Sequence, residues 1–509
     1  MLLAATGLTV VAYGGLVTLD QVTGTLRDGY VPQTVAWYWL AWLGFGLALW
    51  SSERRSIPTA VFWLVPLVAR VVLWSTEPTL SDDVYRYLWD GHLLTSGVNP
   101  YDQIVASPQL DAYHIPIRDL VNNPVMSTPY LPATQGVFAL AAAVGPPRPL
   151  VIQVVMSLFD MATAGLIVVL LSAARLPARR VLLYWWNPLV IVETAHGAHL
   201  DAFMVFAALA AVVTLRLHRA CPDRALDQVH APGWVQALDR VRTLGRGMAW
   251  TLSPLLMAAA TLTRGLPALF AVVLWWRWTW PQRILYGLGS AVPIAAFAVG
   301  PGLGLGQPLA GVGVFGASRL YAEQWQFNSQ FFHLLSGIAR RAGALDPGAT
   351  SRLVAVLAMA SAAAGFWWRS RPSAGATTGA ATTAAANTAA ALANGNRQLL
   401  RIMSLLMMIY VVLTPTLHPW YLIAPAALAP FVAPGADEAG ERWWLLAPWA
   451  FLGFAVILSY LTYLDPAAHA ELAWVRRVEW FPTFALLAGV ALWFRTRAPI
   501  ASRRPTPQG

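Results

Sequence analysis

The sequence predicts an all-α, polytopic integral membrane protein with roughly 12–14 transmembrane helices, and three observations lead to this fold class. First, 57% of the 509 residues are hydrophobic and only 11% are charged, whereas a soluble domain carries about 25% charged residues. Second, apolar runs of about 17–20 residues recur along the chain, the length that a helix needs to cross a bilayer. Third, Arg residues favour alternate connecting segments, as the positive-inside rule requires.

The apolar runs give the predicted spans in chain order. The first run indicates a retained span rather than a cleaved signal, because no basic residues precede it. The segment 248–280 is either two spans or one broken helix pair. The runs lie at 2–19, 34–50, 57–75, 150–172, 181–195, 198–216, 248–262, 266–280, 284–303, 352–369, 398–414, 418–434, 443–461 and 478–494.

Connecting segments divide the chain into five regions. The first large loop is expected to hold juxtamembrane helices, and its apolar stretch from Phe138 to Val144 is too short to span and is expected to lie on the surface. The stretch from Ser373 to Asn396 is almost wholly Ala, Thr, Gly and Asn, which is typical of a flexible linker. The regions are three spans at 1–75, the loop at 76–149, a transmembrane core at 150–369 with an outer loop near 304–351, the linker at 370–397, and the C-terminal spans with a basic tail at 398–509.

Charge predicts the side of the membrane that each segment faces. With the N-terminus inside, the inner segments hold most of the Arg residues, Arg54 and Arg55 among them, while most acidic residues lie outside. The loop 76–149 is then outside and the linker 370–397 is inside. The net charge of +10 suits anionic lipid heads rather than nucleic acid. The single Cys221 excludes an intramolecular disulfide and a cysteine-based metal site.

The run from Ser81 to Gly91 places Asp82, Asp83, Arg86 and Asp90 directly after a hydrophobic span. Such a cluster is costly to bury in lipid, so a helix at the membrane surface is expected from about residue 82 to 96, with the serine as its N-cap. The last three charged residues would share one face. A carboxylate there can accept a hydroxyl proton, as sugar chemistry requires, but acidic residues favouring a helix N-terminus explain the pattern equally well.

The motif Glu193-x-x-His196-x-x-His199-x-Asp201 lies between two predicted spans. Paired histidines with carboxylates suggest a metal, although the spacing differs from that of the usual zinc helix. Polar lining of a sugar pocket is the preferred interpretation, and a structural bridge between helices remains open.

Other polar residues fall at predicted outer ends of spans. Arg264 can clamp a phosphate or only extend its charge to lipid heads. The segment around Asn328 and Gln330 offers amides to sugar hydroxyls, with an aromatic interface belt as the alternative. Arg70 and Asp160 lie within spans, and a structural pair between them is preferred.

The segment from Ser81 to Tyr101 resembles the first extracytoplasmic loop of GT-C glycosyltransferases, most closely polyprenyl-phosphate-mannose-dependent mannosyltransferases and the enzyme that adds the first mannose to GPI anchors. The matching positions are Asp82, Tyr85, Asp90, Gly97 and Pro100-Tyr101. The GPI-type motif is Asp-x-Asp, whereas this chain has Asp82-Asp83-Val84, which leaves a divalent metal uncertain.

Later fragments resemble the same family in the same order. The stretch from Pro129 to Gln135 is similar to its Tyr-Pro-Pro-x-x-Gln segment, with Leu131 in place of the first Pro. The segments around Asn328 and from His418 to Tyr421 resemble its Phe-Asn-Ser and His-Pro-Trp-Tyr segments.

The resemblance implies a GT-C-like fold and transfer of a hexose, most similar to mannose transfer, from a polyprenyl-phosphate carrier to a lipid or glycan hydroxyl, with inversion. It places the site on the extracytoplasmic side of a bacterial plasma membrane, with no cofactor expected. Asp82 is the predicted catalytic base and Asp83 its nearest rival. The predicted substrate-binding residues are Tyr85, Arg86, Asp90, Tyr130, Glu193, His196, His199, Asp201, Arg264, Asn328, Gln330, His418, Trp420 and Tyr421.

Three alternatives remain open. A transporter or flippase for a lipid-linked glycan predicts repeat symmetry between the two halves of the chain, and the sequence has no such repeat. A membrane scaffold leaves the gathering of polar motifs on one face unexplained. A lipid-linked oligosaccharide ligase is the nearer rival within enzymes.

Overall fold

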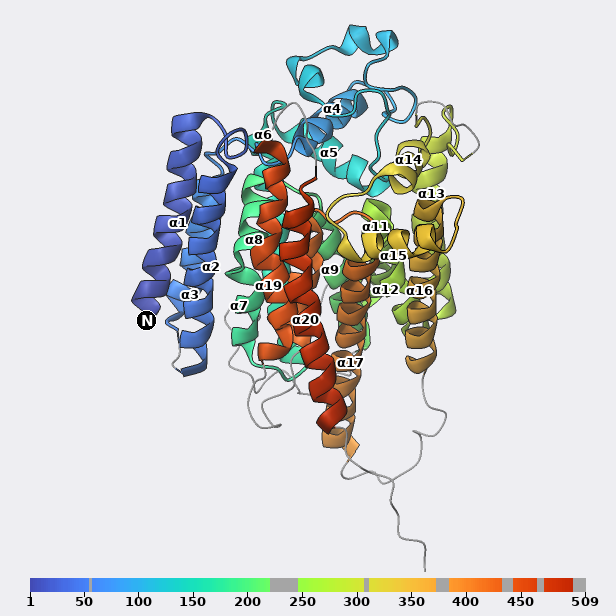
Figure 1. Ribbon diagram of the computed structural model, residues 1–509. Coiled ribbons are helices and arrows are strands. Elements are labelled where there is room, and N and C mark those ends of the chain that lie inside the picture. Colours follow the sequence, from blue (N-terminus) through green and yellow to red (C-terminus); the bar gives the residue numbers. More distant parts are fainter. Residues whose placement is uncertain are drawn as a thin grey trace, which may run out of the picture.

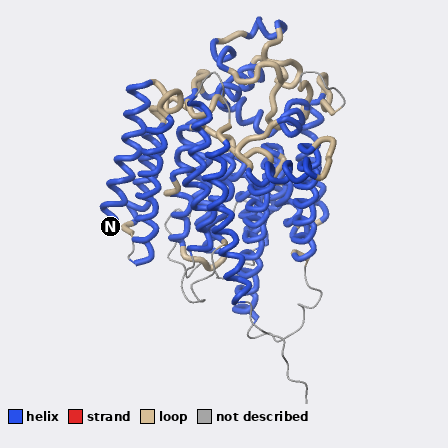
Figure 2. Tube along the Cα trace, viewed as in Figure 1, coloured by secondary structure: helices blue, strands red, loops and turns tan. Residues whose placement is uncertain are grey.

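The computed structural model describes residues 1–54, 57–219, 246–305, 311–371, 384–432, 443–464 and 471–497. Within these ranges the secondary structure is helical throughout, without a β-strand, and the helices run side by side in one bundle (Figures 1 and 2). An isolated parallel bridge joins Phe327 to Thr416. The predicted all-α class is therefore confirmed.

The bundle carries its largest loop region at one end. The helices α1 (Leu2–Thr23), α2 (Val31–Arg54) and α3 (Thr59–Leu73) pack together at one side. The chain then enters α4 (Asp83–Thr95) and α5 (Pro132–Val144), which lie at the end opposite the N-terminus (Figure 1). Figure 2 shows loops gathered around these two helices.

The predicted helix of the large loop is confirmed within one residue at each end. Ser81 is not the N-cap residue, because that position is Asp82. The Ser81 hydroxyl nevertheless accepts a bond from the Asp83 backbone nitrogen at 3.3 Å. The short apolar helix α5 packs against α4, with Phe138 and Tyr87 stacked at 4.7 Å between ring centroids. One side of α5 is therefore covered by protein. A helix that lay on the lipid surface alone would lack this cover.

The middle of the chain forms the centre of the bundle. The helix α6 (Pro149–Ala173) packs on α9 (Asp201–Arg219), and α9 packs on α11 (Arg246–Arg264). Between α6 and α9 the chain passes through a π-helical turn, Val192–His196. The other elements of this part of the chain are α7 (Leu182–Trp185), α8 (Pro188–Ile191), α12 (Ala268–Leu274) and α13 (Trp280–Ala298), the last of which lies at the edge of the bundle (Figure 1).

The C-terminal part adds further helices to the same bundle. Residues 384–397, predicted to belong to a flexible linker, form the first turns of α17, because their Ala-rich sequence has high helix propensity. The elements are α14 (Gly316–Gln324), α15 (Gln330–Arg341), α16 (Pro347–Arg369), α17 (Ala384–Leu413), η7 (Pro419–Leu422), α18 (Ile423–Leu428), α19 (Ala447–Ala455), η10 (Val456–Leu464) and α20 (Ala473–Arg497).

The polytopic membrane class is confirmed, although fewer helices qualify as spans than predicted. Within the described ranges, five helices are long and apolar enough to cross a membrane, or six if the pair Pro188–His196 and Asp201–Leu217, bent by 114°, is one span. The predicted 12–14 is higher, and some of the predicted spans form shorter helices. For example, α3 has 15 residues and α12 has 7.

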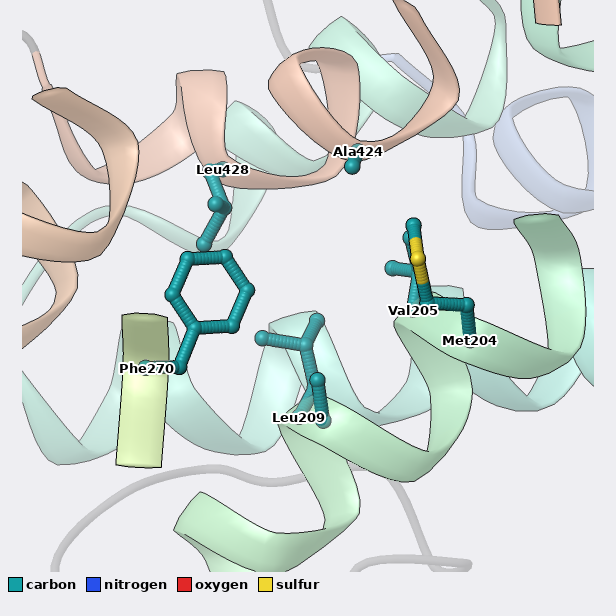
Figure 3. A pocket seen from close by; sticks show the side chains of 7 residues that line it. Met204, Val205, Leu209, Phe270, Ala424 and Leu428 are labelled. Atoms are coloured by element: carbon teal, nitrogen blue, oxygen red, sulfur yellow. The ribbon is translucent and has the colours of Figure 1, made fainter. Parts of the chain in front are cut away.

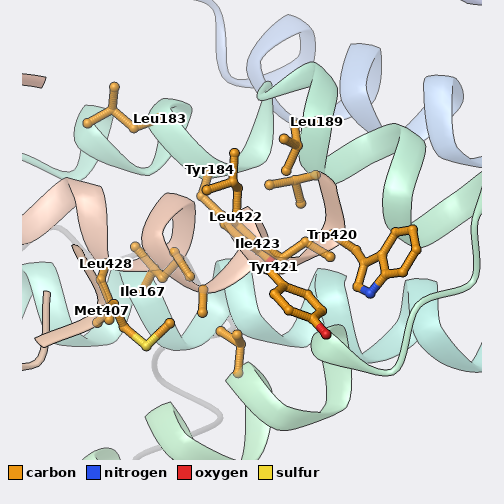
Figure 4. Packing of buried hydrophobic residues seen from close by; sticks show 14 of the residues in the cluster. Ile167, Leu183, Tyr184, Leu189, Met407, Trp420, Tyr421, Leu422, Ile423 and Leu428 are labelled. Carbon is orange, nitrogen blue, oxygen red and sulfur yellow. The ribbon is translucent and has the colours of Figure 1, made fainter. Parts of the chain in front are cut away.

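One large hydrophobic core holds the bundle together (Figure 4). It joins residues from distant parts of the chain, such as Ile167, Tyr184, Met407 and Ile423. Deep in the bundle, the Arg70 Nε donates to Asp160 at 2.5 Å, and both side chains are fully buried. The predicted structural pair is confirmed, and it ties α3 to α6.

Candidate active site

Two adjacent carboxylates open α4, and they have different partners. Asp82 is the N-cap residue, and both of its carboxylate oxygens accept from Arg27 Nη1 at 3.0 Å. Arg27 also donates to Asp28 at 3.1 Å and lies over the Tyr463 ring. The Asp82 side chain is 37% exposed. The Asp82 carboxylate therefore forms an ion pair with Arg27.

Asp83 lies in a more enclosed environment, with an amide rather than a cation as its direct hydrogen-bond partner. The Asn122 side-chain amide donates to it at 3.3 Å. Burial raises the pKa of the Asp83 carboxyl above its ordinary value, and the charge of Arg264 partly offsets this rise. Such a carboxylate binds a proton more readily than one in water. Asp83 therefore lies within the electrostatic reach of Arg264.

Arg264 is the cationic centre of the site. It is the last residue of α11, and its Nε and Nη2 donate to Asp201 at 3.1 and 2.9 Å. Its Nη1 is 3.5 Å from the Tyr421 hydroxyl, which lies 3.1 Å from the Tyr321 hydroxyl. The Arg264 side chain keeps 20% of its surface accessible. Asp201 fixes one edge of the guanidinium, and the other edge remains weakly bonded.

Four rings stack beside this cation. Phe327, His418, Trp420 and His199 follow one another with centroid distances of 4.9, 4.4 and 3.8 Å and interplanar angles of 23°, 1° and 14°. Both His199 ring nitrogens and the Trp420 Nε1 are buried without a hydrogen-bond partner. We call these four residues the aromatic stack. The Nε2 of His199 lies near Glu193, at 3.4 Å.

The remaining parts of the Glu193–Asp201 motif are bonded inside the protein. Glu193 accepts from the Tyr460 hydroxyl at 3.1 Å through each oxygen. The Nε2 of His199 is 3.4 Å from Glu193. His196 pairs through Nδ1 with Thr76 at 2.8 Å. The π-helical turn thus directs Glu193 and His199 to one side and His196 to a structural contact.

Arg86 and Asp90 support the loop rather than line the site. Arg86 donates to the backbone carbonyls of Asn122, Asn123 and Met126, at 2.7 to 3.2 Å. Asp90 accepts from Gln135 at 3.1 Å. Burial raises the pKa of Asp90 to about 6.

The other predicted loop residues lie nearer the site. The Tyr130 ring packs edge-on against Tyr87 at 5.0 Å and contributes a hydrogen bond to Asp83. Tyr85 is partly buried beside the same helix face.

Asn328 and Gln330 are bonded to α20. The Asn328 amide donates to Glu479 at 2.6 Å, and Gln330 accepts from Arg476 at 2.9 Å. Both side chains are almost fully buried. One end of each amide is therefore bonded to a side chain of α20.

A small apolar cavity lies between α9, α12 and α18 (Figure 3). Its lining is wholly apolar and includes Met204, Phe270 and Leu428. Within the described ranges, no group of three or more His, Cys, Asp or Glu side chains is arranged to hold a metal ion.

Four residues of the site were not singled out from the sequence: Arg27, Tyr321, Tyr460 and Glu479. Arg27 carried a usable signal, because it is a basic residue in a segment predicted to lie outside, against the positive-inside bias. Glu479 also carried a signal, because it is a charged residue within the predicted span 478–494. Tyr321, in the predicted outer loop, and Tyr460, near the end of an apolar run, have no local signal.

A membrane bundle that joins a carboxylate, a guanidinium and stacked rings at one end is the arrangement expected of a membrane-embedded sugar transferase. The chain belongs to the MptA/B family, whose profile, described as "Alpha-(1->6)-mannopyranosyltransferase, N-terminal domain", matches residues 2–280. The predicted mannosyltransferase family is thereby confirmed. Asp83, Asp201 and Arg264 lie in the matched part, and His418 lies beyond it.

One relative adds to this assignment over a short segment. The chain is 40% identical over 65 residues to alpha-(1->6)-mannopyranosyltransferase A of Mycobacterium tuberculosis (strain ATCC 25618 / H37Rv). That match spans 12% of this chain and 11% of the relative. No solved structure matches the chain.

Proposed function

We propose that this protein transfers mannose from a polyprenyl-phosphate carrier to a hydroxyl of a lipid or glycan acceptor, at the extracytoplasmic surface of the membrane. Family membership supports the sugar and the donor class. The observation that carries the proposal is the placing of Asp83, which has a raised pKa, within electrostatic reach of Arg264. A base and a phosphate-binding cation are the two groups that this transfer needs.

In the proposed reaction, Asp83 receives the proton and the leaving phosphate receives the electron pair. The acceptor oxygen attacks the anomeric carbon while the bond from that carbon to the phosphate oxygen breaks. The lipid phosphate leaves with the electron pair, and the acceptor hydroxyl proton passes to the carboxylate. Attack from the face opposite the leaving group inverts the centre, so a β-linked donor gives an α-mannoside.

Asp83 is the proposed base, in preference to Asp82. An ion pair with Arg27 holds both Asp82 oxygens, so proton uptake there would break that pair. Within the described residues, the hydrogen bond to the Asp83 carboxylate comes from the uncharged Asn122 amide. Asp82 instead fixes the start of α4 against the loop between α1 and α2.

Arg264 is the proposed contact for the phosphate. Asp201 holds the guanidinium through Nε and Nη2, which leaves Nη1 to turn from the long Tyr421 contact to an anionic oxygen. A charge-assisted bond of this kind is stronger than a neutral one. The aromatic stack lies beside this position, and its Trp420 ring is the proposed packing surface for the sugar.

The test uses the purified protein in lipid nanodiscs with radiolabelled polyprenyl-phosphate-mannose and a total lipid extract. Label should move from the donor into an alkali-stable glycolipid, and an α-mannosidase should release it. Label that crosses the membrane of a proteoliposome without any change of its lipid carrier would contradict transfer and favour a flippase. Transfer of a preassembled oligosaccharide but not of mannose would favour a ligase.

A further inference from the structure

We propose that Glu479 and Trp480 of α20 position the Phe327 and His418 rings of the aromatic stack. They do so through their hydrogen bonds to Asn328, the neighbour of Phe327. This inference rests on the proposed function and identifies positioning residues for the same site. Both residues lie outside the part of the chain that matches the family profile.

The first link joins α20 to Asn328. The Asn328 amide donates to Glu479 at 2.6 Å, and the Trp480 indole nitrogen donates to the Asn328 carbonyl at 2.8 Å. All three side chains are at most 1% exposed. Asn328 has a φ of 50°, in the left-handed region that Asn tolerates better than most residues. Two bonds from one helix thus fix a residue in an uncommon backbone conformation.

The second link joins this loop to the segment that carries His418. The Phe327 nitrogen donates to Pro415 at 3.2 Å, and the Leu417 nitrogen donates to the Phe327 carbonyl at 2.8 Å. The Ser329 hydroxyl donates to Thr414 at 2.5 Å. The two segments therefore move as one unit.

The third link is the stack itself. The Phe327 ring lies on His418, which lies on Trp420. The bonds from α20 to Asn328 are short and buried, and Phe327 and His418 are partly buried, so we expect a shift at Asn328 to displace the ring. A displacement of about 1 Å in a reacting site costs about 100-fold in rate. Glu479 and Trp480 touch no reacting atom, so their effect must pass through His418.

A double-mutant cycle tests this transmission, with kcat and KM for polyprenyl-phosphate-mannose measured in nanodiscs. Glu479→Ala should lower kcat/KM about 10- to 100-fold in the wild-type background. In a His418→Ala background the same change should cost less than about twofold, because the ring that it positions is gone. Glu479→Gln should recover most of the loss, because its carbonyl oxygen accepts the Asn328 bond. Arg477→Ala, an exposed neighbour on α20, is the control and should behave as wild type.

An equal fold-loss from Glu479→Ala in both backgrounds would overturn the inference and assign α20 a general structural role. If Glu479→Ala does not fold, Trp480→Phe replaces it in the cycle, since it keeps a buried aromatic side chain and removes the donor to Asn328. A wild-type protein that binds donor but transfers no mannose contradicts the proposed function alone. In that case the dissociation constant of the donor is measured for each variant of the cycle. Glu479→Ala should then weaken donor binding in the wild-type background and have little further effect in the His418→Ala background.

Discussion

At the residue scale, Asp82 and Asp83 differ through their surroundings rather than through their chemistry. The helix start directs one carboxylate toward the α1–α2 loop and the other toward the interior. The first carboxylate accepts hydrogen bonds from a cation, whereas burial raises the pKa of the second. The roles that we propose for them, anchor and base, follow from this difference.

Replacement of each carboxylate separates the two roles. Asp83→Asn keeps the size of the side chain but cannot accept a proton, so kcat should fall about 10²–10⁴-fold. Asp82→Asn loses a partly exposed ion pair, typically worth about 0.2–1 kcal/mol, and should keep most of the turnover. Asp111→Asn, on an exposed side chain of the same loop, is the control. If Asp82→Asn abolishes turnover and Asp83→Asn does not, the roles are exchanged.

The pH dependence of turnover gives an independent check on Asp83. The base must be deprotonated, and burial raises its pKa above 3.8. Activity should therefore fall as the pH drops through this raised pKa, at a higher pH than an exposed Asp would give. This acid-side fall in activity should be measured as log kcat/KM against pH in nanodiscs. An acid limb centred at the ordinary Asp value would contradict the proposed environment.

Arg264 provides a second prediction at this scale. Arg264→Lys keeps the charge but cannot hold Asp201 and a phosphate together, because a single ammonium replaces a planar fork. The loss of one charge-assisted bond is worth about 1.5–3 kcal/mol, so kcat/KM for the donor should fall about 10- to 100-fold. Arg264→Ala should lose more, and the exposed Arg340→Lys should lose nothing. Unchanged donor kinetics in Arg264→Lys and Arg264→Ala would remove this residue from the site.

At the element scale, the position of α4 depends on its close approach to α5. A Cβ on Gly91 would lie 2.5 Å from the Phe138 carbonyl oxygen, which is backbone and cannot rotate away. The helix α4, which carries Asp83, can therefore approach α5 this closely only with glycine at position 91.

Gly91→Ala tests this packing. Alanine favours a helix by about 1 kcal/mol over glycine, but the forced separation of α4 and α5 should outweigh this gain with a net cost of about 1–3 kcal/mol. Thermal unfolding in detergent measures the change. The matched control is Gly136→Ala in α5, where a Cβ would meet nothing within 4 Å. A Gly91→Ala protein at least as stable as wild type would show that α4 and α5 separate without cost.

Local sequence predicted α4 well and its contacts poorly. The charged run after an apolar segment and the Gly97–Pro100 stop placed its ends within one residue. The Arg27–Asp82 pair joins residues 55 apart, and the Asn328–Glu479 bond joins residues 151 apart. Such pairs depend on how helices pack, which hydropathy and helix signals do not determine. For the same reason Asn328 and Gln330 were expected to face sugar, whereas they face α20.

At the scale of the whole molecule, the predicted topology and the observed bundle agree on one point. The N-terminus and the α4–α5 region lie at opposite ends of the bundle (Figure 1), as an N-terminus inside and a loop 76–149 outside require. The side of the membrane that each end faces is a separate matter, because it depends on the arginine bias alone.

Cysteine labelling decides this last point. In a Cys221→Ser background, single cysteines at Gln109 and Ala385 would be treated with a membrane-impermeant maleimide on intact cells. Gln109 is exposed in the large loop, and Ala385 lies in the first turn of α17. We expect the cysteine at position 109 to react in intact cells and the cysteine at position 385 to react only after permeabilisation. The opposite pattern would place Asp83 and Arg264 on the cytoplasmic side. The acceptor and the donor head would then have to be cytoplasmic too, and the proposed extracytoplasmic transfer would be wrong even if the purified enzyme transfers mannose.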